Sequence, residues 1–498
     1  MTALRNRNGV PGGRVLAATG LFLIASLVAV MAVFAAERGM RVTGLAAICL
    51  CLVIAAAILR DAIVLILGVL VVAISYNRQF YSFDAVIGNY GPSGLYWTLA
   101  DAAMILLLLV AAGVALARRA QVEPRVPRHL SIEPAMLLMI VAMAISALRN
   151  LDVVPGIIET FRIAKYLIMF LILRALLTRE RFWALLFALM AMVMLQTALG
   201  GVQVALSAGG SGLGSIATQE GEMARRATGT LGHPNMYAPF ILTFTCGFVL
   251  MGIIRDYAPW LRLLSLAAGV GGCLAILMSQ SRAPAAGMLL ALGGAGLSLM
   301  LRGLLPPRRM IGGTLILIVM GALALIPMMD RIVDRLTGDF GGSISFRADY
   351  NAAALDIWRE APAFGVGPSG FVPALARHDA VLYGVNEEIQ EARLQVNVKT
   401  IAPVHNVYLL VLAELGIVGL VAFVLFLTSL IRLFHGASRG TAPGHVFFLG
   451  VFWGTLLLFV QQLTDFSLWW DHHMALLVVL AAMAAWLRDS GRMQGMPS

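Results

Sequence analysis

Long apolar segments recur along almost the whole chain and are separated by shorter polar stretches. Hydrocarbon offers no water to the backbone N–H and C=O groups, so an apolar segment that crosses a bilayer does so as a helix that pairs its own backbone. Such a helix needs about 20 residues to cross roughly 30 Å of hydrocarbon. The pattern therefore predicts an all-α, polytopic integral membrane protein with about 14 transmembrane helices, within a range of about 12 to 14. The expected spans are 15–35, 42–59, 62–75, 95–117, 135–148, 157–177, 182–206, 237–254, 263–278, 284–301, 311–329, 406–431, 446–463 and 474–487.

The composition excludes a water-soluble protein. Hydrophobic residues make up 60% of the 498 residues and charged residues only 12%, which is too little polar surface to coat a soluble core. The 36 basic and 26 acidic residues give a net charge of +10. Most Lys and Arg residues stand singly or in pairs at the ends of apolar runs, so the excess indicates contact with anionic membrane lipid and no nucleic acid partner.

Positive charge also orients the expected spans. Arginines recur in every second connection between the expected spans. This places those connections and both termini in the cytoplasm. The opposite side receives one large loop, 330–405. We divide the chain into N-terminal transmembrane helices (1–224), a core that includes this loop (225–431), and C-terminal helices with a cytoplasmic tail (432–498).

Several arginines lie on the outer side, against the usual topological bias. A guanidinium binds phosphate oxygens through two parallel hydrogen bonds, and a pyrophosphate needs several such donors. An anion such as pyrophosphate is therefore one reading of these residues, and contact of each side chain with lipid head groups is the other. The outer-side arginines are Arg225, Arg226, Arg282, Arg331, Arg335, Arg347 and Arg359.

A second charged group lies inside an expected span. Glu159, Arg162 and Lys165 recur at every third residue and so share adjoining parts of one helix face. They either surround the same anionic head group, or Glu159 and Arg162 pair with each other. Asp101 and Gln196 are also expected to be buried, with packing hydrogen bonds as their role.

The outer loop contains an amphipathic helix and ends at a histidine. Residues 345–360 place apolar side chains at helical spacing, which is typical of a helix lying along the bilayer surface. His405 stands where the chain re-enters the membrane, and a neutral imidazole there accepts a proton from a sugar hydroxyl or serves as an interfacial hydrogen-bonding group. His233, in Gly-His-Pro-Asn, indicates a structural turn and a helix start.

The outer side has no Asp/Glu pair and no His/Cys cluster with the spacing of metal ligands. The four cysteines lie in apolar stretches without metal-like spacing. We therefore expect no metal and no cofactor.

Four motifs in this order resemble the O-antigen ligase and Wzy-type polymerase superfamily of bacterial envelope glycosyltransferases. The resemblance covers roughly residues 225–425. The motifs are Arg226-Ala-Thr-Gly-Thr-Leu-Gly-His-Pro-Asn235, Ser279-Gln-Ser-Arg282, Ala361-Pro-Ala-Phe-Gly-Val-Gly-Pro368, and His405-Asn-Val-Tyr-Leu409 continuing through Glu414-Leu-Gly-Ile-Val-Gly-Leu420.

The resemblance implies an inverting, metal-independent enzyme in the bacterial inner membrane. Such an enzyme moves a glycan from undecaprenyl pyrophosphate to an acceptor hydroxyl at the periplasmic face. Polymerases extend a glycan, whereas ligases attach it to lipid A-core, and the motifs leave both open. By matching position, Arg226 and Arg282 hold the pyrophosphate and His405 is the base, while Arg225, Arg162, Lys165 and Arg347 are further candidates for pyrophosphate contacts.

A transporter or flippase for lipid-linked sugars is the alternative class. Such proteins often have two related halves or broken helices near the middle of the membrane. The sequence shows no convincing internal repeat, and its polar residues gather at one surface, which favours the enzyme. A noncatalytic scaffold for envelope assembly would not need the Arg and His motifs to converge.

Overall fold

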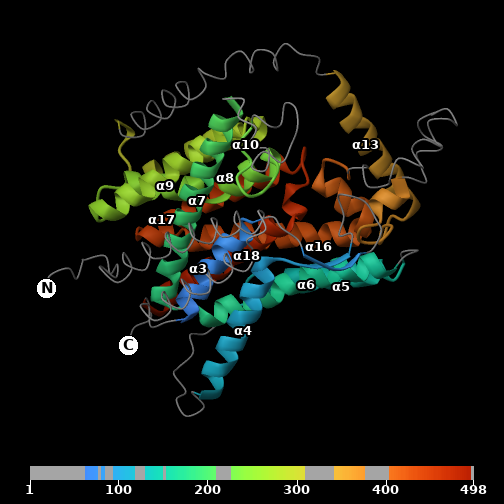
Figure 1. The fold of residues 1–498 in the computed structure, drawn as a ribbon, viewed down its shortest axis with the longest axis horizontal. Coiled ribbons are helices and arrows are strands. Elements are labelled where there is room, and N and C mark those ends of the chain that lie inside the picture. The colour runs from blue at the N-terminus through green and yellow to red at the C-terminus, as the bar shows by residue number, and fades with distance from the viewer. Residues whose placement is uncertain are drawn as a thin grey trace.

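The computed structural model describes residues 62–76, 80–84, 94–117, 129–149, 153–208, 226–308, 341–375 and 403–494 (Figure 1). The expected spans 15–35, 42–59 and 311–329 lie outside them. The helices are α3 (Ala62–Ile74), α4 (Leu99–Ala117), α5 (Glu133–Ala147), α6 (Val153–Leu176), α7 (Arg179–Ala208), α8 (Pro234–Ile253), α9 (Pro259–Met278), α10 (Arg282–Leu301), α13 (Gly341–Glu360), α16 (Val407–Ala437), α17 (Pro443–Gln461) and α18 (Asp471–Gln494), with the 3-10 helix η4 (Ser467–Trp469).

The described part of the chain is a bundle of membrane-spanning helices. Seven helices within it, namely α7, α8, α9, α10, α16, α17 and α18, are long and apolar enough to cross a bilayer. Three shorter apolar helices, α3, α4 and α5, accompany them. Helix α6 is 24 residues long but carries the charged residues Glu159, Arg162 and Lys165 along its length. The expected multi-pass membrane protein is confirmed.

The expected all-α fold class is confirmed, and the described residues add one short strand pair to it. Strand β1 (Phe80–Asp84) pairs antiparallel with β2 (Gly94–Trp97), with Phe80 opposite Trp97. Aromatic residues are frequent in strands, and these two segments are rich in them. The helix expected from residue 95 therefore begins at Leu99.

Asp101 fixes the start of α4. The Thr98 amide donates to Asp101 Oδ2 at 2.8 Å, and the Asp101 amide donates to Thr98 Oγ1 at 3.2 Å. This reciprocal pair satisfies two amides that have no partner within the helix. Asp101 forms hydrogen bonds, as expected, but they cap its own helix and the residue is only half-buried.

The core of the bundle runs along α8, which packs against α9, α10 and α17. Tyr237, Phe240, Phe244 and Phe248 recur at helical spacing on α8 and are fully buried. A Cβ on Gly450 of α17 would lie 2.1 Å from the Gly247 amide nitrogen, so α8 and α17 touch backbone to backbone. Small residues allow this close approach between membrane helices.

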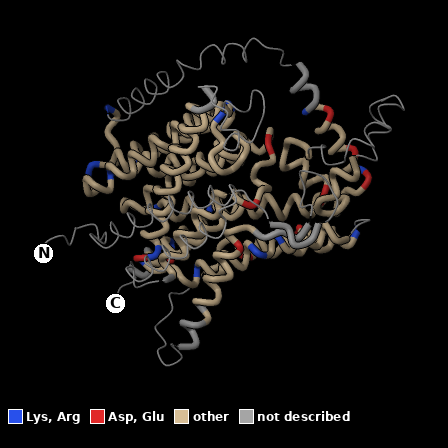
Figure 2. The backbone as a smooth tube through the Cα atoms, in the orientation of Figure 1, with Lys and Arg blue, Asp and Glu red and all other residues tan. Residues whose placement is uncertain are grey.

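Polar contacts join the helix ends that carry the expected cytoplasmic arginines. Arg174 Nη2, near the end of α6, donates to Asp489 Oδ2 of α18 at 2.8 Å. Arg302 Nη1, after α10, donates to the Ser438 carbonyl, after α16, at 2.7 Å. Figure 2 shows Lys and Arg at the left end of the bundle, where α9 begins in Figure 1. The orientation that the arginines predict stays a prediction.

Helix α16 is broken at Gly416, whose φ of 63° and ψ of −166° are not helical. The break leaves carbonyls before it and amides after it without partners inside the helix. The loop 361–370 pairs with them. Val366 and Gly367 donate to the Ala413 and Glu414 carbonyls at 3.0 and 2.8 Å, and Ile417 and Val418 donate to the Pro362 and Ala363 carbonyls at 3.0 and 3.2 Å. Ser146 Oγ of α5 donates to the Phe364 and Glu414 carbonyls at 2.5 and 2.9 Å.

Helix α13 is the amphipathic helix expected in the outer loop. Its side chains Ala353, Ala354 and Ile357 are buried, and it packs against α16. Arg347 and Arg359 remain exposed. The apolar face of α13 thus packs on protein, and the expected position along the bilayer surface stays a prediction.

Candidate active site

Three segments meet beside Arg226. Arg226 Nε donates to the Ser279 carbonyl at 2.8 Å, and Arg226 Nη2 donates to Asn235 Oδ1 at 3.3 Å. Ser281 Oγ donates to the same Asn235 oxygen at 2.8 Å. Arg226 is therefore fixed between the start of α8 and the turn from α9 to α10. Arg282 follows Ser281 as the first residue of α10, and its side chain is exposed.

The turn between α9 and α10 has an unusual backbone. Gln280 has a φ of 53°, in the left-handed region that residues other than glycine rarely adopt. Such strain persists where the surroundings hold it, often at functional sites. Here Ser279 and Ser281 on either side are buried, and the turn directs Arg282 to the exposed N-terminus of α10. A helix N-terminus adds its own attraction for anions to that of the guanidinium.

The segment that carries Arg226 is held by two glutamines of α7. Gln196 Oε1 accepts from the Thr230 amide at 3.0 Å, and Gln203 Oε1 accepts from the Thr228 and Gly229 amides at 3.0 and 2.9 Å. The two glutamines are seven residues apart and so lie on one helix face. The expected role of Gln196 is confirmed. The sequence analysis missed Gln203, although the same seven-residue spacing points to it.

His233 begins α8, as expected. Its Nδ1 accepts from the Asn235 amide at 3.1 Å, and Pro234 occupies the first turn. Burial, together with the charges of Arg226 and His405, lowers the pKa of His233 to about 4. The imidazole is neutral at pH 7, which its acceptor role requires.

His405 lies in the turn before α16. The side chain of the next residue, Asn406, caps that helix by accepting from the Tyr408 amide at 3.0 Å. The Val407 amide donates to the carbonyls of Gln462 and Asp465, both at 3.1 Å, which ties the turn to the segment after α17. The imidazole of His405 is partly buried and meets the Phe466 ring edge-on at 5.3 Å between ring centres.

The electrostatics of His405 favour the neutral imidazole. Burial lowers its pKa from the ordinary value, and the charge of Arg347 lowers it further, while the Pro403 carbonyl opposes the shift. Its Nδ1 is buried, and the described residues offer it no hydrogen-bond partner. A neutral imidazole at pH 7 has a lone pair for a proton.

Electrostatic interactions link four side chains, those of Arg226, His233, Arg347 and His405. Arg347 of α13 acts on His405, His405 acts on His233, and Arg226 acts on His233. Arg347 also acts on Asp465, whose pKa burial raises to about 6 against hydrogen bonds from Phe466 and Ser467. Asp465 is a residue that the sequence analysis missed, because its position in a short turn gives no pattern.

Arg162 and Lys165 occupy a different cluster, on α6. Arg162 Nε donates to Glu159 Oε2 at 2.9 Å, and Arg162 Nη1 donates to Asp471 Oδ1 at 3.1 Å. Lys165 Nζ lies 3.2 Å from Asp101 Oδ1 and 3.9 Å from Asp471 Oδ2. Glu159 and Arg162 thus pair with each other, which is one of the two arrangements expected from the sequence.

A pyrophosphate contact for Arg162 and Lys165 stays a prediction, and their carboxylate partners weaken the case for it. Arg225 lies outside the described residues. Among the residues with described positions, no three His, Cys, Asp or Glu side chains are grouped so that they hold a metal ion.

The other two motifs have a structural role. Residues 361–368 and 414–420 form the two sides of the break in α16, joined by the backbone hydrogen bonds described above. Their glycines permit close contact, since a Cβ on Gly365 would lie 2.3 Å from the Glu414 carbonyl carbon. This junction holds α13, and with it Arg347, against α16.

Residues 264–424 match the family model described as O-antigen ligase. The match contains the Ser279–Arg282 turn, α13, the 361–370 loop and His405, while the segment 226–235 precedes it. No curated protein matches the chain. The match supports the resemblance seen in the motifs: about a third of this multi-pass helical chain, residues 264–424, is similar to the O-antigen ligase family.

Proposed function

We propose that this protein is an inverting, metal-independent glycosyltransferase that works at the periplasmic face of the inner membrane. It moves a glycan from undecaprenyl pyrophosphate to a sugar hydroxyl, either on a growing glycan as a polymerase or on lipid A-core as a ligase. One observation carries the proposal. Arg226 and His405 come from segments far apart in the sequence and both act electrostatically on His233, and Arg347 of a third segment acts on His405.

The donor in this proposal is held by its diphosphate. Arg226 and Arg282 flank the turn between α9 and α10, and Arg347 faces His405 from α13. A diphosphate carries several negative charges, and guanidinium groups bind its oxygens with charge-assisted hydrogen bonds. The same arginines stabilise the additional charge that develops on the diphosphate as it leaves.

The reaction is a single displacement. The acceptor hydroxyl oxygen attacks the anomeric carbon from the side opposite the diphosphate, so the new C–O bond forms as the bond to the diphosphate oxygen breaks. The leaving diphosphate takes the bonding electron pair, and the imidazole of His405 takes the hydroxyl proton. Attack from the opposite side inverts the anomeric centre.

Replacing Arg226 by alanine is expected to weaken donor use more than acceptor use. A hydrogen bond to a charged group contributes about 1.5–3 kcal/mol, which corresponds to a loss of roughly tenfold to more than a hundredfold. The measurement is kcat/KM for the lipid-linked donor with purified protein. Arg308→Ala, an exposed arginine beyond the other end of α10, is the matched control and should leave donor use unchanged. An Arg226→Ala protein with the donor kcat/KM of the parent would remove Arg226 from the site.

Deleting the gene distinguishes polymerase from ligase. A polymerase mutant is expected to lose all high-molecular-weight glycan, because no repeat units are joined. A ligase mutant is expected to accumulate long glycan on its lipid carrier, because only the final transfer is missing. The readout is the length of surface and carrier-linked glycan, and an unchanged glycan profile would contradict both.

A further inference from the structure

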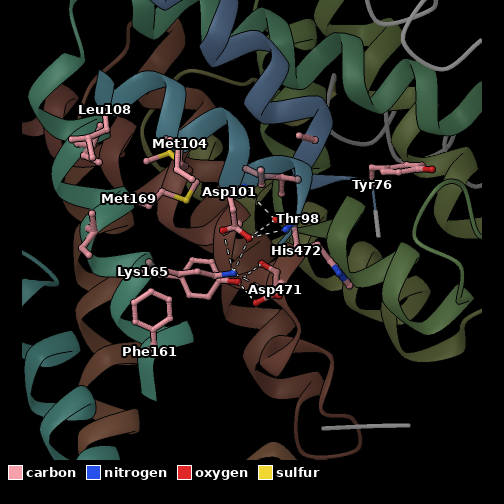
Figure 3. Close-up of a pocket in the computed structure, with 18 residues that line it drawn as sticks. Tyr76, Thr98, Asp101, Met104, Leu108, Phe161, Lys165, Met169, Asp471 and His472 are labelled. Atoms are coloured by element: carbon pink, nitrogen blue, oxygen red, sulfur yellow. Dashed lines mark hydrogen bonds and ion pairs between the residues drawn. The ribbon is translucent and has the colours of Figure 1, made fainter. Parts of the chain in front are cut away.

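The charged groups around the cavity in Figure 3 bind one another. The Lys165 ammonium lies between two carboxylates, 3.2 Å from Asp101 Oδ1 and 3.9 Å from Asp471 Oδ2. The Tyr166 hydroxyl also donates to Asp471 Oδ1. The hydrogen-bonding capacity of this cluster is therefore largely used within the protein. The side chain of Asn235, at the candidate active site, differs in this respect.

The orientation of the Asn235 side chain is fixed by its neighbours. Arg226 Nη2 and Ser281 Oγ donate to Asn235 Oδ1 at 3.3 and 2.8 Å. A guanidinium donates hydrogen bonds and never accepts them, so the amide atom that faces Arg226 is the oxygen. The backbone amide of Asn235 donates to His233 Nδ1 at 3.1 Å, which holds the residue at the start of α8.

The amide nitrogen of Asn235 is available to a ligand. Nδ2 carries two N–H groups, and neither has an acceptor among the residues whose positions are described. Asn235 is partly exposed, and Nδ2 is not buried. Contact with Arg226 and Ser281 uses the amide oxygen alone, so the N–H groups serve no described contact within the protein.

The choice of an amide as the partner of Arg226 favours an anionic ligand. A carboxylate at position 235 would bind the guanidinium more strongly, through a charge-assisted hydrogen bond, but its negative charge would repel a diphosphate. The amide holds Arg226 without adding that charge. It also presents N–H groups on the same amide carbon whose oxygen contacts the guanidinium. The two side chains are thus close enough to bind one diphosphate.

We propose that Asn235 is a further diphosphate-binding residue, whose Nδ2 donates to an oxygen of the diphosphate held by Arg226. The inference rests on the proposed function, since it takes the lipid-linked diphosphate as the ligand. Arg226 contributes charge, and Asn235 contributes a neutral N–H group whose direction is fixed before the ligand arrives. A group that is already fixed loses little conformational freedom on binding.

Binding of undecaprenyl pyrophosphate without a glycan tests this contact. The purified full-length protein in detergent is titrated with this carrier, and Kd is measured for the parent and for Asn235→Ala. A hydrogen bond to a charged group contributes enough that Asn235→Ala should raise Kd by about tenfold. Thr428→Ala removes one side-chain hydrogen bond inside α16, and as the control it should leave Kd unchanged.

A double variant separates direct contact from positioning. If Asn235 only held Arg226, its replacement would change nothing once Arg226 is alanine. With a contact of its own, Asn235→Ala should raise Kd by about threefold or more in the Arg226→Ala background. Ser281 still donates to Asn235 Oδ1 in that background, so the amide keeps its direction. Equal Kd values for Arg226→Ala with and without Asn235→Ala would overturn the proposal.

Asn235→Asp keeps the test valid if Asn235→Ala folds poorly. Aspartate retains an oxygen for Arg226 and Ser281, so the local fold should persist. It has no N–H group and adds a negative charge, so its Kd for the carrier should rise more than that of Asn235→Ala. A Kd equal to that of the parent would refute the contact.

The same titrations distinguish this inference from the proposed function. A parent protein that does not bind undecaprenyl pyrophosphate would overturn both. Binding that is weakened by Arg226→Ala but unchanged by Asn235→Ala and Asn235→Asp would overturn the role of Asn235 alone. A loss seen only with the glycan-bearing carrier would place the amide on the sugar and would also contradict a diphosphate contact.

Discussion

Replacing His405 by alanine is expected to lower the rate of glycan transfer by about 10²–10⁴-fold, which is the range that a positioned general base contributes. The charge of Arg347 acts on the imidazole of His405, and His405 and Arg226 both act on His233. Donor binding should be retained, because the arginines proposed to hold the diphosphate are unchanged. The measurement is kcat with saturating lipid-linked donor, alongside donor Kd.

A second histidine of α16 serves as the control. His435 is exposed near the opposite end of the same helix, so His435→Ala should leave kcat unchanged. Transfer at the parent rate by His405→Ala would take His405 out of the mechanism. A loss of donor binding together with kcat would instead give His405 a structural role at the start of α16.

The pH profile provides an independent reading of the same residue. The base acts in its neutral form, so activity should be present above its pKa and decline as the pH falls through it. Burial and Arg347 lower the pKa of His405, so the acid limb of kcat/KM should have its midpoint below the ordinary value of about 6.5. A midpoint above 7 would contradict a base of this environment.

The long apolar runs predicted the membrane helices, because such helices depend on local sequence. Spans expected at 284–301 and 237–254 appear as α10 and α8, with starts two and three residues earlier. The early start of α8 comes from His233, which caps the helix from outside the apolar run. The strand pair β1–β2 was missed because it depends on pairing between segments rather than on hydropathy.

The candidate site was predicted in part. Arg226, Arg282 and His405 stand out because charge beside apolar segments is costly and therefore informative. The partners of Arg162 and Lys165 did not stand out, since Asp471 lies 309 residues from Arg162 along the chain. Only the packing of α18 against α6 brings them together. Asp465 and Gln203 likewise take their importance from contacts that are distant in the sequence.

The break in α16 shows the same limit. The apolar run from 406 to 431 predicts one continuous helix, and Gly416 within it is compatible with that pattern. The carbonyls and amides freed by the break are satisfied by the loop 361–370, which is more than forty residues away in sequence. The two motifs were recognised separately, and only the fold shows that they are one junction.

Replacing Gly416 by alanine is expected to destabilise the protein severely. Its φ of 63° and ψ of −166° belong to a region that is essentially confined to glycine, with a cost of about 1–3 kcal/mol for other residues. The new Cβ would lie 2.4 Å from the Ala363 carbonyl carbon, and such overlap with fixed backbone costs about 1–3 kcal/mol more. The measurement is Tm and folded yield of the detergent-purified protein.

Gly303→Ala is the matched control for this prediction. Gly303 also has a positive φ, of 70°, but a Cβ there would meet nothing within 4 Å. Gly303→Ala should therefore lose only the stability that a positive φ costs an alanine. Its Tm should fall much less than that of Gly416→Ala. Equal losses would mean that the contact with the 361–370 loop contributes nothing. If Gly416→Ala folds with a small loss, transfer should still decline, because the loop positions α13 and Arg347 beside His405.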